Sequence, residues 1–217
     1  MKVIEVSRLI EGDVLPAMAE VSARLDELGA GHAIDTLNWE SFGCKPEVRF
    51  NIAYGDKEIY LKYYVRESNT KAEKDQPNQM VCEDSCVEFF VSPSDDGIYY
   101  NFEFNPIGTV LLGAGHGRAD SKRADPSYTE RIRRITTMGD KPFGEIKGDI
   151  RWSLTLAIPI DIFFHHNVTA LKGRIFRANF YKCGDKLSTP HFVTWNPVKT
   201  EKPDYHRPEF FGTLKFV

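Results

Sequence analysis

The feature that most constrains the fold is an alternation of apolar and other residues in many short segments. Apolar residues occupy every second position of 50–54 and of 59–65, and Gly55 and Asp56 lie in the turn between these segments. Side chains alternate faces along a strand, so each segment reads as a strand with one apolar face, and the turn indicates a hairpin. The sequence predicts further strands at 87–91, 98–105, 110–112, 129–136, 151–158, 174–181, 191–195 and 212–216.

One segment near the N-terminus follows a different period. Apolar residues recur at helical spacing between Val14 and Leu28, and Gly29 follows as a stop signal, which predicts a short helix. About ten short strands with almost no helix favour two packed sheets over alternating strands and helices. We therefore expect an all-β fold, an antiparallel and jelly-roll-like β-sandwich with a short N-terminal helix. With no repeat or linker visible, 1–217 reads as one domain, with 1–45 as an extension packed on it.

Charge and hydropathy exclude two classes of partner. The chain has 28 basic and 31 acidic residues, and its densest basic stretch, 131–134, reads as a solvated strand face. Nucleic acid is therefore a poor candidate ligand. No apolar run is long enough to span a membrane, and Lys2 and Glu5 interrupt the start before any signal-peptide core. From the sequence as given we expect a cytoplasmic protein.

The central predicted strands carry a second, polar face. Glu88 lies opposite in phase to the apolar residues of its strand, and the same holds for Asn101 and Glu103 and for Arg177 and Asn179. A polar face can simply be solvated. Short amides combined with Glu and Arg favour instead a surface that binds hydroxyl groups, because they supply both donors and acceptors.

Loops supply the other candidate site. The polar stretches 66–84 and 113–127 read as long loops, and loops of that length are often functional. Near the C-terminus, Trp195 lies in the run HFVTWNP, and Tyr205 lies in a loop flanked by prolines. An exposed ring there can stack on the apolar face of a sugar, although packing on the sheet edge is an equal alternative.

Four motifs together carry a resemblance to a known family. They are CEDSCVEFF at 82–90, YNFEFN at 100–105, WNP at 195–197 and PEFFG at 208–212. From about residue 48 onward the chain resembles the family 9 carbohydrate-binding modules, and more closely their stand-alone relatives often found in Bacteroidetes.

The resemblance implies a β-sandwich that holds the end of a sugar chain between two tryptophans and binds structural calcium. One tryptophan position matches Tyr205, which keeps a ring, and the other matches Cys82, which does not. Binding is therefore expected to be weaker than in the family or different. The family's polar contacts match the polar face already identified, at or near Glu88, Asn101, Arg177 and Asn179.

We therefore expect a non-catalytic domain that binds a mono- or oligosaccharide. The predicted site comprises Glu88, Asn101, Glu103, Arg177, Asn179, Trp195, Tyr205 and Cys82. A structural or interaction module and a component associated with a glycoside hydrolase are alternatives. Glu88 and Glu103 could form a hydrolytic pair on neighbouring strands, but an open polar face should not raise either pKa. A haem site would require a pair such as Met80 and His191.

Metal content follows mainly from the resemblance. Calcium ligands could come from Asp84, Asp95, Asp96 and carboxylates near Asp120, although no EF-hand loop is present. The four cysteines, Cys44, Cys82, Cys86 and Cys183, read as free and mostly buried thiols. On one extended strand Cys82 and Cys86 would lie ~13 Å apart, too far to share a zinc ion.

Overall fold

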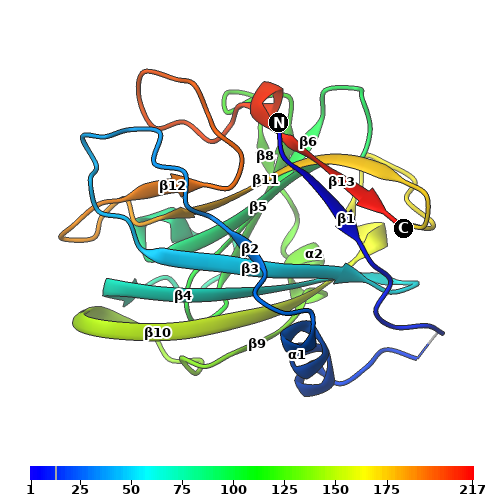
Figure 1. The fold of residues 1–217 in the computed structure, drawn as a ribbon, viewed down its shortest axis with the longest axis horizontal. Helices are drawn as coiled ribbons and strands as arrows, with labels where there is room; N and C mark the ends of the chain where they lie inside the picture. The colour runs from blue at the N-terminus through cyan, green and yellow to red at the C-terminus, as the bar shows by residue number, and fades with distance from the viewer. Residues whose placement is uncertain (13) are drawn as a thin grey trace.

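The computed structural model describes residues 1–12 and 14–217, and it contains two packed sheets (Figure 1). In the described residues, eight strands form the first sheet, in the order β1-β13-β11-β5-β6-β7-β8 with β12 also paired to β11. These strands are β1 (Val3–Val6), β13 (Gly212–Phe216), β11 (Ile175–Cys183), β5 (Cys86–Ser92), β6 (Tyr99–Phe104), β7 (Val110–Gly115), β8 (Lys122–Arg123) and β12 (Phe192–Thr194).

The second sheet has five strands among the described residues, in the order β2-β3-β4-β10-β9. They are β2 (His32–Ala33), β3 (Glu47–Tyr54), β4 (Glu58–Ala72), β10 (Phe143–Pro159) and β9 (Arg133–Thr136). Neighbouring strands run antiparallel, except that β1 and β13 are parallel. The predicted all-β sandwich is confirmed, and this parallel pair is the departure from a purely antiparallel arrangement.

The sandwich core lies where the alternation places it. On β10, Trp152, Leu154, Leu156 and Ile158 are all buried in the main core, as their spacing predicts. Aromatic rings join the two sheets: Phe50 of β3 stacks on Phe180 of β11 with ring centroids 3.8 Å apart. Burial of such rings is the largest source of stability available to a sheet pair.

Helices occupy the periphery of the sandwich. The helix α1 (Met18–Glu27) is shorter than predicted, and Val21 and Leu25 pack against the outer face of the second sheet. Figure 1 shows α1 on the side of that sheet away from β5 and β11. The short helical turns are α2 (Pro126–Glu130), η1 (Val81–Glu83), η2 (Ile160–Ile162) and η3 (Pro208–Phe210). None of the described helices is both long and apolar enough to cross a membrane.

Two sequence predictions of local structure are wrong. The stretch 66–84 is not a loop throughout, because β4 continues to Ala72 and pairs with a β10 that begins at Phe143. Four of the six polar residues at 66–71 are buried by partners rather than solvated, so the polarity of this segment concealed the strand. The stretch 129–136 begins in α2, and only Arg133–Thr136 pairs as a strand.

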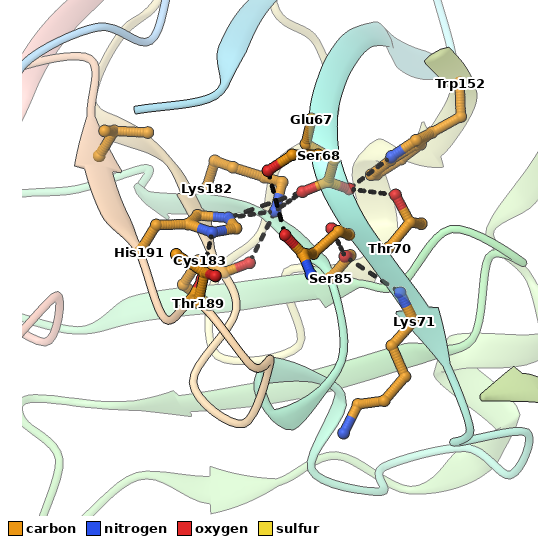
Figure 2. Close-up of polar contacts among 12 residues, drawn as sticks. Glu67, Ser68, Thr70, Lys71, Ser85, Trp152, Lys182, Cys183, Thr189 and His191 are labelled. Carbon is orange, nitrogen blue, oxygen red and sulfur yellow. Dashed lines mark hydrogen bonds and ion pairs between the residues drawn. The ribbon is translucent and has the colours of Figure 1, made fainter. Parts of the chain in front are cut away.

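A buried ion pair also joins the two sheets (Figure 2). The Lys182 Nζ of β11 lies 2.8 Å from the Glu67 Oε2 of β4, and both side chains are almost fully buried. The other Glu67 oxygen accepts a hydrogen bond from the Trp152 indole at 2.8 Å. Lys182 also donates to His191 Nε2 at 2.6 Å, so the imidazole proton lies on Nδ1 and faces the Thr189 carbonyl. These bonds compensate two charges that would otherwise be costly to bury.

The imidazole in this cluster is held neutral. Burial, followed by the positive charge of Lys182, lowers the pKa of His191 to about 2 from an ordinary value of 6.5. Between these values a proton binds His191 in the unfolded chain but not in the folded protein. Lowering the pH through this window therefore stabilises the unfolded state.

We predict that the free energy of unfolding falls as the pH drops below 6.5, with His191 contributing at most about 1.4 kcal/mol per pH unit. His191→Gln keeps an oxygen that can accept from Lys182 but does not titrate, so its stability should depend less steeply on pH. Urea unfolding between pH 7 and about pH 5 measures the two slopes. Identical slopes would show that His191 is not held neutral in the folded protein.

Candidate functional site

A pocket of about 250 Å³ opens on the outer face of the first sheet, opposite the sandwich core. Strands β5, β6, β7 and β11 form its floor, while η1, the 116–121 turn and the 203–206 loop form its walls. The side chains that line it include Met80, Cys82, Glu88, Asn101, Glu103, Arg118, Arg123, Cys183, Asp185, Phe192, Asp204, Tyr205 and His206.

Three predicted polar residues meet on the pocket floor. Glu88 of β5 lies directly opposite Glu103 of β6, and Asn101 lies two residues from Glu103 on the same face. The Asn101 amide donates to Glu103 Oε1 at 2.9 Å. Gly113 of β7 faces Asn101, and a Cβ there would approach the Asn101 side-chain oxygen to 2.7 Å. A glycine at this position is therefore needed to leave room for the amide.

The floor carboxyls are strongly desolvated. Burial, followed by the neighbouring Glu103, raises the pKa of Glu88 well above its ordinary value. Burial raises the pKa of Glu103 to about 7, against the opposing effect of the Asn101 hydrogen bond. The expectation that an open face would leave these acids unperturbed is wrong, because the face is covered. A protonated carboxyl both donates and accepts hydrogen bonds, so the floor is suited to hydroxyl groups.

The pocket walls carry an arginine in an ion pair, a neutral imidazole and a second arginine, Arg123, whose guanidinium contacts the Met80 sulfur. Arg118 donates to Asp204 at 3.0 Å across the 116–121 and 203–206 loops. His206 Nδ1 lies 2.6 Å from the Tyr99 hydroxyl, and burial followed by Arg118 lowers the pKa of His206 to about 4. At neutral pH this imidazole is uncharged. The walls therefore present hydrogen-bonding groups beside the Arg118–Asp204 ion pair and the Arg123 guanidinium.

Tyr205 and Cys82 both line the pocket, but Tyr205 is not the exposed ring that the sequence predicts. It is 6% exposed and stacks on Tyr181 with centroids 4.0 Å apart. Its hydroxyl donates to the carbonyls of Lys182 and Val193. One ring face is thus fully used inside the protein. Cys82 is half-buried in η1, and as a cysteine it supplies no aromatic ring for stacking.

The structure places the other three predicted site residues outside the pocket. Trp195 is on the core side of the sheet, where its ring packs edge-on against Phe50 and Phe180. Arg177 and Asn179 share the outer face with Glu88, but nearer the other end of β11. Arg177 donates to the carbonyls of Phe211 and Gly212, and Asn179 donates to that of Asn196.

These hydrogen bonds fix residues 196–211, which we call the covering segment, against the outer face of the first sheet. Val198, Tyr205 and Phe211 of this segment pack on the outer face of the sheet, in a second hydrophobic cluster with Phe90 and Tyr181. The covering segment buries most of a face that would otherwise be solvated. The pocket is the part of this face that the segment leaves open.

Sequence reasoning missed several wall residues. Arg118 and Arg123 come from the charged 113–127 stretch, and Asp185 comes from the turn after β11. The length and charge of the 113–127 stretch were the available signal, since such loops are often functional. Nothing in the sequence indicates that Asp185, whose carboxyl pKa is raised by burial, lines the same pocket as Glu88 and Glu103.

Among the described residues, the carboxylates considered for calcium do not gather into one cluster of possible ligands. Asp84 is fully buried and accepts from the Lys74 amide and the Asn105 side chain. Asp96 accepts from Ile98 and His166, and Asp120 accepts from the backbone of its own turn. They therefore do not fit as a common calcium site, and calcium binding stays a prediction. The haem pair does not form either, because Met80 lines the pocket while His191 is buried beside Lys182.

A comparison with protein families places the chain in a known family. The model of carbohydrate-binding family 9 matches residues 21–216, which is most of the chain. The chain belongs to carbohydrate-binding family 9. The four sequence motifs predict the same family, and that prediction is confirmed. No curated protein matches the chain.

Solved structures support the assignment to family 9. A candidate carbohydrate-binding protein from Bacteroides uniformis is 40% identical, with a TM-score of 0.94 over 100% of this chain and 99% of its own. A family 9 module from Caldicellulosiruptor kristjanssonii in complex with glucose is 14% identical, with a TM-score of 0.60, covering 100% of this chain and 96% of its own. The complex of a family 9 module from the same organism with cellotriose is 14% identical, with a TM-score of 0.59, covering 99% of this chain and 93% of its own. At this identity the two complexes show a shared fold.

The burial of Tyr205 in this family 9 domain leads to a stability prediction. Tyr205→Ala should lower the free energy of unfolding by about 3–5 kcal/mol, because it removes a buried aromatic ring. Tyr205→Phe keeps the stacking on Tyr181 but loses the two hydroxyl contacts, and should cost only about 1 kcal/mol. Urea denaturation measures both variants. A loss below about 1 kcal/mol for Tyr205→Ala would indicate an exposed ring, as the sequence suggested.

Proposed function

We propose that this domain is a non-catalytic sugar-binding module whose pocket holds one sugar ring, as a monosaccharide or as the end of an oligosaccharide. The observation that carries the proposal is the floor of the pocket. There Glu88, Asn101 and Glu103 lie together, desolvated and facing the cavity. Membership of family 9 makes carbohydrate the appropriate ligand class.

The hydrogen-bonding state of the floor supports this proposal. Among the described residues, the one donor that the structure shows for the Glu88 carboxyl is the Cys183 thiol, at 3.1 Å. Buried carboxyls with spare donor and acceptor capacity are costly unless a ligand or water completes them. Ring hydroxyls of a sugar both donate and accept, and they match this requirement.

The size of the pocket favours a short ligand. A cavity of about 250 Å³ accommodates one hexose ring but not a chain along its length. Tyr205 is already stacked on Tyr181, so polar contacts carry more of the affinity than ring stacking does. The glucose and cellotriose complexes of the Caldicellulosiruptor module make glucose and short glucans the ligands to test first.

The floor carboxyls do not provide hydrolytic machinery in this proposal. A retaining hydrolase needs one ionised carboxylate as nucleophile beside a protonated acid. Burial raises the pKa of both Glu88 and Glu103, which disfavours the ionised nucleophile. Incubation of the protein with cellotriose should therefore leave the trisaccharide intact, and release of glucose would contradict this part of the proposal.

Binding is tested by calorimetry on chelator-treated protein, with glucose, xylose and cellotriose as ligands. Asn101→Ala and Glu103→Ala should each weaken binding about tenfold or more, since a hydrogen bond to a buried polar group contributes about 1.5 kcal/mol. Asn167→Ala and Glu130→Ala are matched controls at exposed positions away from the pocket, and they should bind as the unmodified protein does.

Two outcomes would overturn the proposed function. If calorimetry detects no heat of binding with any of the three sugars, and a wider glycan array shows no binding, a sugar pocket is excluded. Equal affinities in the unmodified protein, Asn101→Ala and Glu103→Ala would place the sugar elsewhere on the surface. Circular dichroism of each variant checks that the sandwich is retained.

A further inference from the structure

We propose that the floor of the pocket also binds a thiophilic divalent cation, such as Zn²⁺, through Cys86, Cys183 and Glu88. This inference goes beyond sugar binding and concerns a different kind of ligand, at a site that shares Glu88 with the proposed sugar site. The calcium implied by the family is a separate matter, because calcium prefers oxygen ligands while two thiolates select a softer metal.

The strand register brings the three ligands together. Cys183 of β11 lies directly opposite Cys86 of β5, and Glu88 lies two residues along β5 on the same face. The two sulfur atoms and a Glu88 oxygen all lie within 4.8 Å of one another, and Cys183 Sγ lies 3.1 Å from Glu88 Oε1. In tetrahedral zinc sites such ligand atoms are about 3.5 Å apart. Small side-chain movements therefore suffice for coordination.

The cluster is buried yet reachable. All three side chains are buried, which shields them from competing water. Glu88 and Cys183 line the pocket, so an ion can enter from solvent along the proposed sugar path. Zinc sites that keep an exchangeable ligand have three protein ligands and a fourth position that is open. The three side chains here, with the cavity beside them, match that arrangement.

Two more donor side chains lie beside this open position. Cys82 and Asp185 both line the pocket, and the Asp185 amide donates to the Cys82 carbonyl at 3.0 Å. The sequence argument against zinc assumed one extended strand through Cys82 and Cys86. In the structure Cys82 belongs to η1 and β5 begins at Cys86, so that argument is wrong for this chain. The partner of Cys86 comes instead from β11.

Cobalt is the spectroscopic probe for this site, used on the reduced, chelator-treated full chain without sugar. We expect one equivalent of Co²⁺ to produce near-ultraviolet sulfur-to-metal charge transfer and visible bands of tetrahedral coordination. Zn²⁺ should then abolish both by displacement, since it binds more tightly than Co²⁺ at such sites. Cys86→Ser and Cys183→Ser should each weaken Zn²⁺ binding about 100-fold or more, because even loss of a group that only orients a ligand costs 10- to 100-fold.

Two further variants keep the test independent of folding defects. Glu88→Gln should weaken the binding of Zn²⁺ but retain the sulfur charge transfer, because both thiolates remain. Cys44→Ser removes a cysteine outside the cluster and should change neither measurement. Circular dichroism confirms that each variant keeps its strands.

Several results would overturn the proposal. These are no charge transfer with Co²⁺, a signal lost in Cys44→Ser, or a signal unchanged in both cluster variants. Formation of a Cys86–Cys183 disulfide that persists under reducing conditions would also exclude it, because the thiols would then be consumed. The metal titration contains no sugar and the sugar titration contains no metal, so either function can fail while the other stands.

Discussion

The central constraint in this structure is that the middle strands of the first sheet are covered on both faces. The second sheet covers one face with aromatic rings, and the covering segment, residues 196–211, covers most of the other. A sheet face buried in this way leaves its polar side chains without solvent. Their behaviour then depends on local partners, which accounts for the raised pKa of Glu88 and Glu103 and for the lowered pKa of His206.

The same constraint separates two uses of one polar face. Toward the Cys183 end of β11, polar groups face a cavity and keep hydrogen-bonding capacity for a ligand. Nearer its start, Arg177 and Asn179 donate their hydrogen bonds to the Phe211 and Asn196 carbonyls of the covering segment. These two residues therefore act on the pocket through the segment that they anchor, and that segment carries Tyr205, Asp204 and His206.

The sequence was sufficient to predict which side chains share a face, because alternation along a strand is a local property. It predicted the sandwich, the core side of β10 and the common face of Glu88, Asn101 and Glu103. It did not predict where along that face the cavity would lie, since this depends on how distant segments fold back. Tyr205 illustrates the limit: its prolines indicate a loop, but its burial depends on contact with Tyr181 of β11. The strand at the polar end of β4 was not predicted for a related reason: its pairing depends on β10, which is distant in the sequence.

The buried ion pair between Lys182 and Glu67 has a consequence for the opposite side of the sheet. Lys182 and Cys183 are consecutive in β11, so they point to opposite faces. A slip of one residue in the pairing of β11 would turn Lys182 to the outer face of the sheet. Glu67 would then remain between the sheets as an unpaired buried charge. Correct registration of β11 is therefore enforced from within the core. The Lys182–Glu67 ion pair therefore also determines that the Cys183 thiol faces the cavity, although Cys183 takes no part in that pair.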